Sequence, residues 1–382
     1  MFMNKKQMRK YIILFFFSLS IYIFHAMYTK HAIYGDGNGY YVTAQSVVYE
    51  KTLNSKQILE HLSNFVGRKY IFSRIFWNES INPYPVGTSL IWTPFLILAS
   101  LLSTNRFDLF HEIFTGSSGI ILMLTGLYFL EKYLLNFYKP YIVLISILTI
   151  FFGSNVFYYT TLEPALSHQP AFFIICFLLY WTNKFKFSNK NLIIFGLISG
   201  LFTTVRLADS VLLIPLLFNL KLNFKRIVLI GFGFLIGITP QLYSQFYYYG
   251  NIFINPYLIG SSGHWSANLG HIFEYLFSFK RGLFIWSPIY LVGIYGLYKL
   301  KKRIILYSIL LLTLIGSFWS AYLSAGFGQR LIFSATPFFA IGIADIYKKI
   351  TLKNRSWLSF FFISWNIFML IGFYLLQWKN VP

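Results

Sequence analysis

The sequence predicts an all-helical protein that crosses a membrane many times. Hydrophobic residues make up 57% of the chain and charged residues only 11%, whereas soluble proteins carry about 25% charged residues. Apolar runs of the length that crosses a bilayer recur along the chain, and most Lys and Arg residues stand in short clusters between them. We therefore expect a single integral membrane domain over 1–382, without a separate soluble domain.

The chain begins with a basic segment at 4–10, which an apolar run at 11–28 follows. This order is typical of a secretory signal sequence, but no small-residue cleavage site precedes the polar segment that comes next. We interpret the run as an uncleaved first span with its N-terminus in the cytoplasm.

Further spans are predicted by length, because a helix needs about 20 mostly apolar residues to cross a core of about 30 Å. With the first span, the runs that we assign as full crossings are 11–28, 109–130, 141–158, 168–182, 227–247, 283–298, 304–322, 331–347 and 357–376. The stretch 86–103 and the interrupted run 191–220 can each be interpreted in two ways.

The charge distribution decides both cases. Six basic clusters hold 20 of the 32 Lys and Arg residues, and the positive-inside rule favours placing all six in the cytoplasm. That requires 191–220 to be a hairpin with its tip at 203–209. It also requires 86–103 to stay on the outer side, either in the interface or entering and returning, which its proline-rich start at 82–85 permits. The result is about eleven crossings.

Most polar residues outside these clusters then fall on the outer face, in a long first loop at about 29–107 that contains interfacial helices, and in shorter loops. The glycine-rich segment 34–41 begins that loop and carries Asp36, one of only 11 acidic residues in the chain. A carboxylate just outside a span is a candidate for chemistry. It could equally cap a helix that starts near Asn38.

The composition favours neither nucleic-acid binding nor a site built from cysteines. A net charge of +21 can indicate nucleic-acid binding, but these basic residues lie between apolar runs, where membrane topology explains them better. The single cysteine, Cys176, lies within an apolar run, so the sequence predicts neither a disulfide framework nor a Cys-based metal site.

Five segments share the outer side in the predicted topology or border it: 35–46, 84–95, 196–206, 279–288 and 326–330. Taken in this order, they resemble segments of the GT-C glycosyltransferases, the polytopic enzymes related to protein mannosyltransferases and to the aminoarabinose transferase of lipid A. Two differences stand out: Gly37 follows Asp36 where relatives often carry a second acidic residue, and the sequence stops after its last span where many relatives continue into a soluble outer domain.

The resemblance implies transfer of a hexose or pentose from a polyprenyl-phosphate-linked donor to a lipid, glycan or protein acceptor. The reaction would take place at the outer face of the cytoplasmic membrane. The family also places its proline-rich segment in an outer interfacial helix, in agreement with the charge argument for 86–103.

Asp36 is the predicted general base, because an acceptor hydroxyl attacks the anomeric carbon only as its proton is taken. Glu163 is the second catalytic candidate. Arg and Lys residues at the outer interface can stabilise the charge on the departing lipid phosphate. The predicted substrate-binding residues are Tyr40, Tyr41, His168, Arg206, Asp209, Lys280, Arg281, Gln329 and Arg330.

Several candidates also have a purely structural interpretation. Arg206 and Asp209 are three positions apart and could form an ion pair with each other. Lys280 and Arg281 flank a span and could be interfacial anchors, and Glu163 could cap a helix. Arg330 follows a Gly-x-Gly turn and has no acidic residue nearby in the sequence, which favours a role in the site.

No cofactor is expected. His168 and His264 could hold a divalent metal together with Asp36, but the sequence does not fix the spacing of ligands on separate loops, so this is not favoured. A metal held by an acidic pair is not favoured either, because Gly37 follows Asp36. Two alternative functions stay open, a flippase or transporter of lipid-linked sugars and a glycan polymerase or ligase. Transporters often show internal repeats and ionisable groups near the bilayer midplane, and the sequence shows neither. A polymerase or ligase would depend on outer Arg and His residues without a carboxylate after the first span.

Overall fold

The computed structural model describes residues 5–58, 82–254, 268–319 and 326–375, and within these ranges it is helical, without a β-strand. The elements are α1 (Lys5–Thr29), α2 (Gly37–Gln45), the π-helical turn η1 (Ser46–Glu50), α5 (Val86–Leu102), α6 (Leu109–Leu134), α7 (Pro140–Phe152), α8 (Val156–Thr161), α9 (His168–Thr182), α10 (Asn189–Val205), the 3₁₀ turn η3 (Ala208–Leu213), α11 (Ile214–Asn219), α12 (Phe224–Tyr249), α13 (Leu269–Phe277), α14 (Leu283–Trp286), α15 (Ile289–Lys299), α16 (Arg303–Phe318), the 3₁₀ turn η5 (Arg330–Ala335), α17 (Thr336–Lys349) and α18 (Leu352–Leu375).

Five helical stretches in the described residues are long and apolar enough to cross a membrane: Met8–Thr29 of α1, α6, α12, the continuous segment Arg330–Lys349, and α18. Shorter apolar helices include α5, α7, α9, α10 and α16. The prediction of a helical membrane protein is therefore confirmed at this level.

Two of the predicted spans are interrupted. The run 141–158 stops at Phe152 with Gly153 as the cap, and a separate short helix, α8, begins at Val156. The run 283–298 breaks at Pro288, because proline has no N–H to continue the hydrogen-bond ladder. These breaks shorten the regular helices and supply irregular backbone beside the loops described below.

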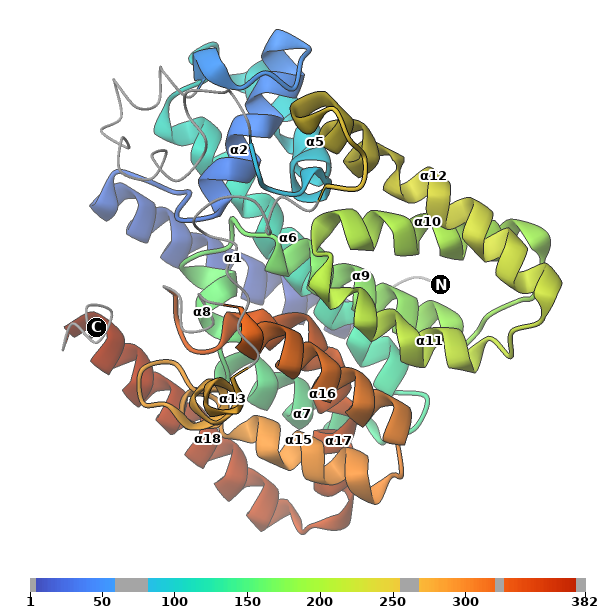
Figure 1. Ribbon diagram of the computed structural model, residues 1–382. Helices are drawn as coiled ribbons and strands as arrows, with labels where there is room; N and C mark the ends of the chain where they lie inside the picture. The colour runs from blue at the N-terminus through green and yellow to red at the C-terminus, as the bar shows by residue number, and fades with distance from the viewer. Residues whose placement is uncertain (1–4, 59–81, 255–267, 320–325, 376–382) are drawn as a thin grey trace.

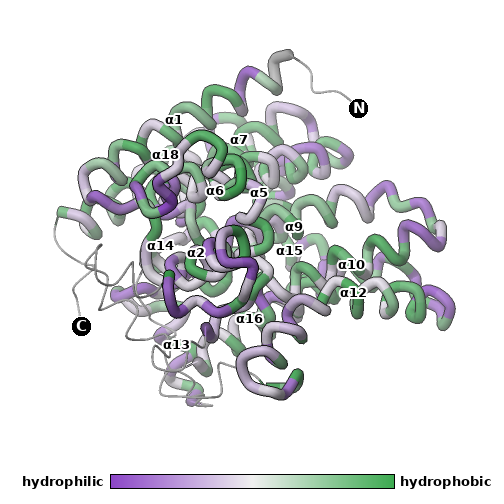
Figure 2. Tube along the Cα trace, turned by 90° about the horizontal axis from the view of Figure 1, so that it is seen from above, coloured by the Kyte–Doolittle hydropathy of each residue, from purple (hydrophilic) through white to green (hydrophobic). Residues whose placement is uncertain are grey.

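The bundle has two polar ends. The N-terminus and the turns that join α6 to α7, α9 to α10, α11 to α12 and α15 to α16 lie to the right in Figures 1 and 2, while α2, α13 and the C-terminus lie to the left. Hydrophilic segments in Figure 2 concentrate in these end regions. The predicted basic clusters of these turns thus share one end of the bundle.

The predicted hairpin turns where expected. Helix α10 ends at Val205, Arg206 is its extended C-cap, and η3 begins at Ala208. From there α11 runs back toward the right-hand end (Figure 1).

Helix α5 corresponds to the stretch 86–103 and packs against α2 and α6. The Ser89 hydroxyl donates to the Tyr40 carbonyl of α2 at 2.8 Å. Helix α5 thus holds α2 in place, and α2 begins directly after Asp36. The remainder of the predicted outer loop at 59–81 lies outside the described residues, as do parts of the later outer segments.

Candidate active site

Asp36 stands at the N-cap of α2, but its side chain makes no capping hydrogen bond. Instead, its Oδ2 forms an ion pair with Nη2 of Arg330 at 2.9 Å, and its Oδ1 accepts a hydrogen bond of 3.3 Å from the Tyr84 hydroxyl. Of the two interpretations of Asp36, capping is therefore not the one its side chain adopts. The Asp36 side chain is 37% exposed and that of Arg330 only 11%, so the carboxylate is the accessible partner.

Two close approaches fix the start of α2 at this position. A Cβ on Gly37 would lie 2.2 Å from the carbonyl oxygen of Ala165, and one on Gly39 would lie 2.1 Å from the Tyr84 ring. Only glycine leaves room for these contacts, so the glycines of this segment bring Asp36 against both the loop at 162–167 and the segment before α5.

Arg206 and Asp209 form the ion pair that their spacing allowed, with Nε and Oδ2 2.7 Å apart. Asp209 is fully buried and also accepts a hydrogen bond from the Ser334 hydroxyl. Arg206 reaches further, since its Nη1 donates to the Ser167 hydroxyl at 3.2 Å. The pair therefore links η3 to η5 and to the loop before α9.

Tyr40, in the first turn of α2, lies near Ser167 and within range of the Asp36, Arg206 and Arg330 charges. Burial raises the pKa of Tyr40 to about 12, and the Asp36 charge adds to this shift. The phenol is therefore neutral at physiological pH. Because η5 carries both Arg330 and Ser334, it connects the Asp36–Arg330 ion pair to the network of Asp209, Arg206 and Ser167. We call the following set the polar ring: Asp36, Arg330, Ser334, Asp209, Arg206, Ser167 and Tyr40.

Glu163 lies beside the ring. Its Oε1 accepts a hydrogen bond of 2.7 Å from the Tyr158 hydroxyl, and the N-cap of α9 is Ser167, so the capping interpretation of Glu163 does not hold. Burial raises the pKa of Glu163, although the Tyr158 hydrogen bond and the Arg330 charge oppose the shift. The carboxyl can thus act on a proton at a higher pH than an ordinary glutamate.

Two further predicted residues line this region. His168 is buried between the rings of Tyr159 and Phe333, and its Nδ1 has no hydrogen-bond partner among the described residues. Arg281 is only 6% exposed, and its Nε donates to the carbonyl of Gly326 at 2.9 Å. Arg281 is therefore not a snorkelling anchor: it holds the glycine-containing turn that precedes Arg330.

Three other predicted substrate-binding residues make local hydrogen bonds. The Tyr41 hydroxyl accepts from Gln45 within α2, and Gln329 caps η5 through its side chain. The backbone N–H of Lys280 donates to the Ser278 hydroxyl at 3.1 Å. The contacts described for these three residues are thus local ones, within α2, η5 and the segment 278–280.

Sequence reasoning missed Tyr84, Ser167, Tyr158 and Ser334. Tyr84 stands beside Pro83 and Pro85, and Ser167 stands beside His168, in segments that the sequence analysis selected. The sequence pattern does not distinguish a hydroxyl group that contacts a site from one that does not. Ser334 and Tyr158 carry no signal at all, since their partners Asp209 and Glu163 are recognisable only in space.

A metal is not indicated by the described side chains, among which no group of three or more His, Cys, Asp or Glu residues could hold one. His264, one of the ligands considered above, lies outside the described residues.

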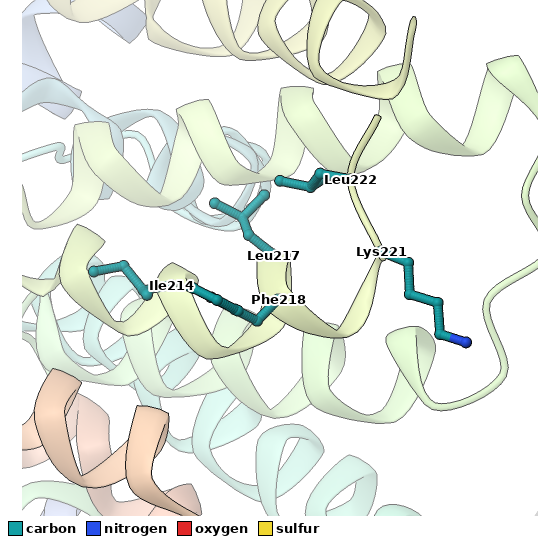
Figure 3. Close-up of a pocket in the computed structure, with 5 residues that line it drawn as sticks. All are labelled: Ile214, Leu217, Phe218, Lys221 and Leu222. Atoms are coloured by element: carbon teal, nitrogen blue, oxygen red, sulfur yellow. The ribbon is translucent and has the colours of Figure 1, made fainter. Parts of the chain in front are cut away.

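A hollow of about 580 Å³ lies at the other end of α11, lined by Ile214, Leu217, Phe218, Lys221 and Leu222. Figure 3 shows the Lys221 ammonium pointing away from the apolar side chains. The other labelled side chains of this hollow are apolar, whereas the polar ring gathers charged side chains, so the polar ring is the candidate site.

Comparison of the chain with protein-family models, with curated proteins and with solved structures finds no match. The function of the polar ring therefore has to be argued from its own geometry.

Proposed function

We propose that the chain is an integral membrane glycosyltransferase of the GT-C type. It transfers a hexose or pentose from a polyprenyl-phosphate-linked donor to a lipid, glycan or protein acceptor, with Asp36 as the general base. The observation that carries the proposal is the pairing of a partly exposed Asp36 with a nearly buried Arg330.

The pairing suits a general base. A carboxylate that removes a proton must be held in one orientation within hydrogen-bond reach of the acceptor hydroxyl. Arg330 and Tyr84 each engage one oxygen of Asp36, and the remaining lone pairs of both oxygens can face an acceptor. The proton of the attacking hydroxyl passes to Asp36 as the hydroxyl oxygen bonds to the anomeric carbon.

Arg330 can also stabilise the negative charge on the departing phosphate. As the bond from the anomeric carbon to the phosphate oxygen breaks, its electron pair stays on the phosphate, and guanidinium groups stabilise such charge by paired hydrogen bonds. The guanidinium of Arg330 is planar and carries five N–H donors, and its Nη2 binds Asp36. Arg206, held by Asp209 and Ser167 on the far side of the ring, supplies a second cation.

The positive-inside rule supports the proposed orientation. With the basic turns in the cytoplasm and about eleven crossings, the end that carries α2 faces outward, where the lipid-linked donor presents its sugar. The protein then resides in the cytoplasmic membrane with its N-terminus inside.

The test is a transfer assay in membranes with radiolabelled polyprenyl-phosphate sugars, comparing wild type with Asp36→Asn at matched expression. Asparagine keeps the shape of the side chain and an oxygen for Arg330 but is a far weaker base. We expect transfer to fall by about 10²–10⁴-fold, the typical contribution of a general base, with the protein still present in the membrane.

Glu50→Gln is the matched control, because Glu50 belongs to the same outer region but pairs with Arg106 at 2.7 Å. It should leave transfer unchanged. Transfer retained by Asp36→Asn would exclude Asp36 as the base. If wild type itself moves no label, while the carrier-linked sugar changes side of the membrane in its presence, the protein is a flippase.

A further inference from the structure

The backbone of Ala32, four residues before Asp36, is held by side chains at both its N–H and its carbonyl oxygen. Its N–H donates to Oε2 of Glu112 at 2.9 Å, and its carbonyl oxygen accepts from the Tyr22 hydroxyl at 2.8 Å. Tyr22 belongs to α1 and Glu112 to the first turn of α6. Two separate helices thus hold one point of the chain between them.

Glu112 is only 3% exposed. Burying a carboxylate costs free energy unless hydrogen bonds satisfy it, and a bond from a backbone N–H to a charged oxygen is one of the stronger kinds. The hydrogen bond from the Ala32 N–H to this buried carboxylate therefore ties the segment before Asp36 to α6.

Two glycines on the same face of α6 allow further close contacts with α1 and with the loop at 162–167. A Cβ on Gly116 would lie 1.8 Å from the Tyr22 hydroxyl, and one on Gly119 would lie 1.9 Å from the carbonyl oxygen of Pro164. Helix α6 therefore holds the segment that leads to Asp36 and also the loop that carries Glu163.

Only three residues separate Ala32 from Asp36, and backbone hydrogen bonds constrain the turn that contains Asp36. Gly35 has a φ of +50°, in the left-handed region that favours glycine. The backbone N–H groups of Gly37 and Asn38 bond to the carbonyls of Tyr34 and Gly35 at 2.9 and 3.1 Å. A displacement of Ala32 is therefore transmitted to the Asp36 carboxylate.

We propose that Glu112 is a positioning residue for the reaction of Asp36: by binding the Ala32 peptide it fixes the turn that holds the carboxylate against Arg330. This inference rests on the proposed function for its catalytic consequence, whereas the holding of the turn can be measured without any reaction.

The first measurement is hydrogen–deuterium exchange, by mass spectrometry, of the purified full-length protein. Glu112→Ala removes the acceptor, so peptides that cover 30–37 should exchange at least about tenfold faster than in wild type, because a protected amide becomes free to open. Glu112→Gln keeps an oxygen at the same place and should retain most of the protection. Peptides from α9, α12 and α17 should be unchanged, which shows that the variant is folded.

The second measurement is the transfer reaction at varied acceptor concentration. Misplacing a catalytic group by about 1 Å can cost 10²-fold in rate, so Glu112→Ala should lower kcat by about 10–100-fold. KM for the acceptor should change less than twofold, and Glu112→Gln should restore most of the rate. Loss of overall stability would lower the amount of active protein without this rescue.

Glu131→Ala is the matched control. Glu131 is also a buried acid of α6 that binds α1, since its Oε2 accepts from Lys10 and from Tyr11 at 2.6 Å each, but it lies at the other end of the helix. Its loss should increase exchange near the start of α1 and leave the exchange of 30–37 and kcat unchanged.

Unchanged exchange over 30–37 in Glu112→Ala would overturn the holding role, and faster exchange with an unchanged kcat would overturn the positioning role. An equal effect of Glu131→Ala on 30–37 would also overturn the inference. If wild type transfers no sugar, the proposed function fails, while the exchange result still decides whether Glu112 holds the turn.

Discussion

The sequence and the structure lead to different interpretations of Arg330. In the sequence it has no acidic residue nearby, and this absence favoured a role in the site. In the structure its partner is Asp36, from the opposite end of the chain. Arg330 does lack an acidic residue nearby in the sequence, but it is not unpaired. Its ion pair joins two segments that are far apart along the chain.

Glu163 leads to a prediction about pH. Burial raises the pKa of this carboxyl in the folded protein, whereas in the unfolded chain it titrates at about 4.3. Between these two pKa values the folded state binds more protons than the unfolded state, so the free energy of unfolding falls as pH rises. Glu163→Gln, which has no proton to lose, removes this contribution.

Thermal unfolding in detergent at a series of pH values between about 4 and 8 measures the effect. The Tm of wild type relative to Glu163→Gln should fall as pH rises through this window and then level off. A Tm difference that stays constant with pH, or that grows in favour of wild type, would contradict the raised pKa.

At the level of elements, glycines determine how closely helices pack. Along α10 and α12, a Cβ on Gly196, Gly200, Gly233 or Gly237 would lie 2.0 to 2.4 Å from a backbone oxygen of the opposite helix. Small residues at such contacts let two backbones approach, as is common between membrane helices. The close pairing of α10 with α12 holds the hairpin whose tip presents Arg206.

A comparison of two glycines within α12 tests this packing. Gly233 faces α10, with Ile193 O 2.0 Å from its ideal Cβ, whereas a Cβ on Gly231 would meet no atom within 4 Å. Gly233→Ala should therefore destabilise the protein by about 1–3 kcal/mol, the usual cost of overpacking. Gly231→Ala should be neutral or stabilising, by up to about 1 kcal/mol, through helix propensity.

Unfolding in detergent with a chemical denaturant gives both values under the same conditions. The two variants add the same methyl group to the same helix, so propensity cancels in the comparison and only the contact differs. Equal effects of the two substitutions would mean that α10 and α12 do not pack through these glycines.

For the whole molecule, the two ends differ in character. The turns that carry the basic clusters share one end with the N-terminus, and α2 and α13 lie toward the other (Figure 1). If the basic end is cytoplasmic, as proposed, the polar ring faces outward.

Labelling of single cysteines in intact cells checks this orientation. In a Cys176→Ser background, Lys56→Cys should react with a membrane-impermeant maleimide, and Lys190→Cys should react only after the membrane is permeabilised. Both lysines are exposed in the structure, so a difference in labelling reports sidedness and not burial. The reverse pattern would place the polar ring in the cytoplasm and exclude a donor presented outside.

The sequence by itself determined the helical, membrane-type architecture, because apolar runs and charge clusters are local properties whose consequences follow from the solvent. It also located the hairpin tip near Arg206 and selected Asp36, Glu163, Arg206 and Arg330, since charged residues are so rare in this chain that each one is conspicuous.

Only the tertiary structure decided how these residues combine. The pairing of Asp36 with Arg330, the link from Arg206 to Ser167 and the hold of Glu112 on Ala32 each join segments that are distant along the chain. The physical reason is that a side chain's partner depends on how helices pack, and packing here depends on close backbone approaches at particular glycines. No local sequence pattern predicts which face of α6 contacts Tyr22 or which loop packs against Gly37.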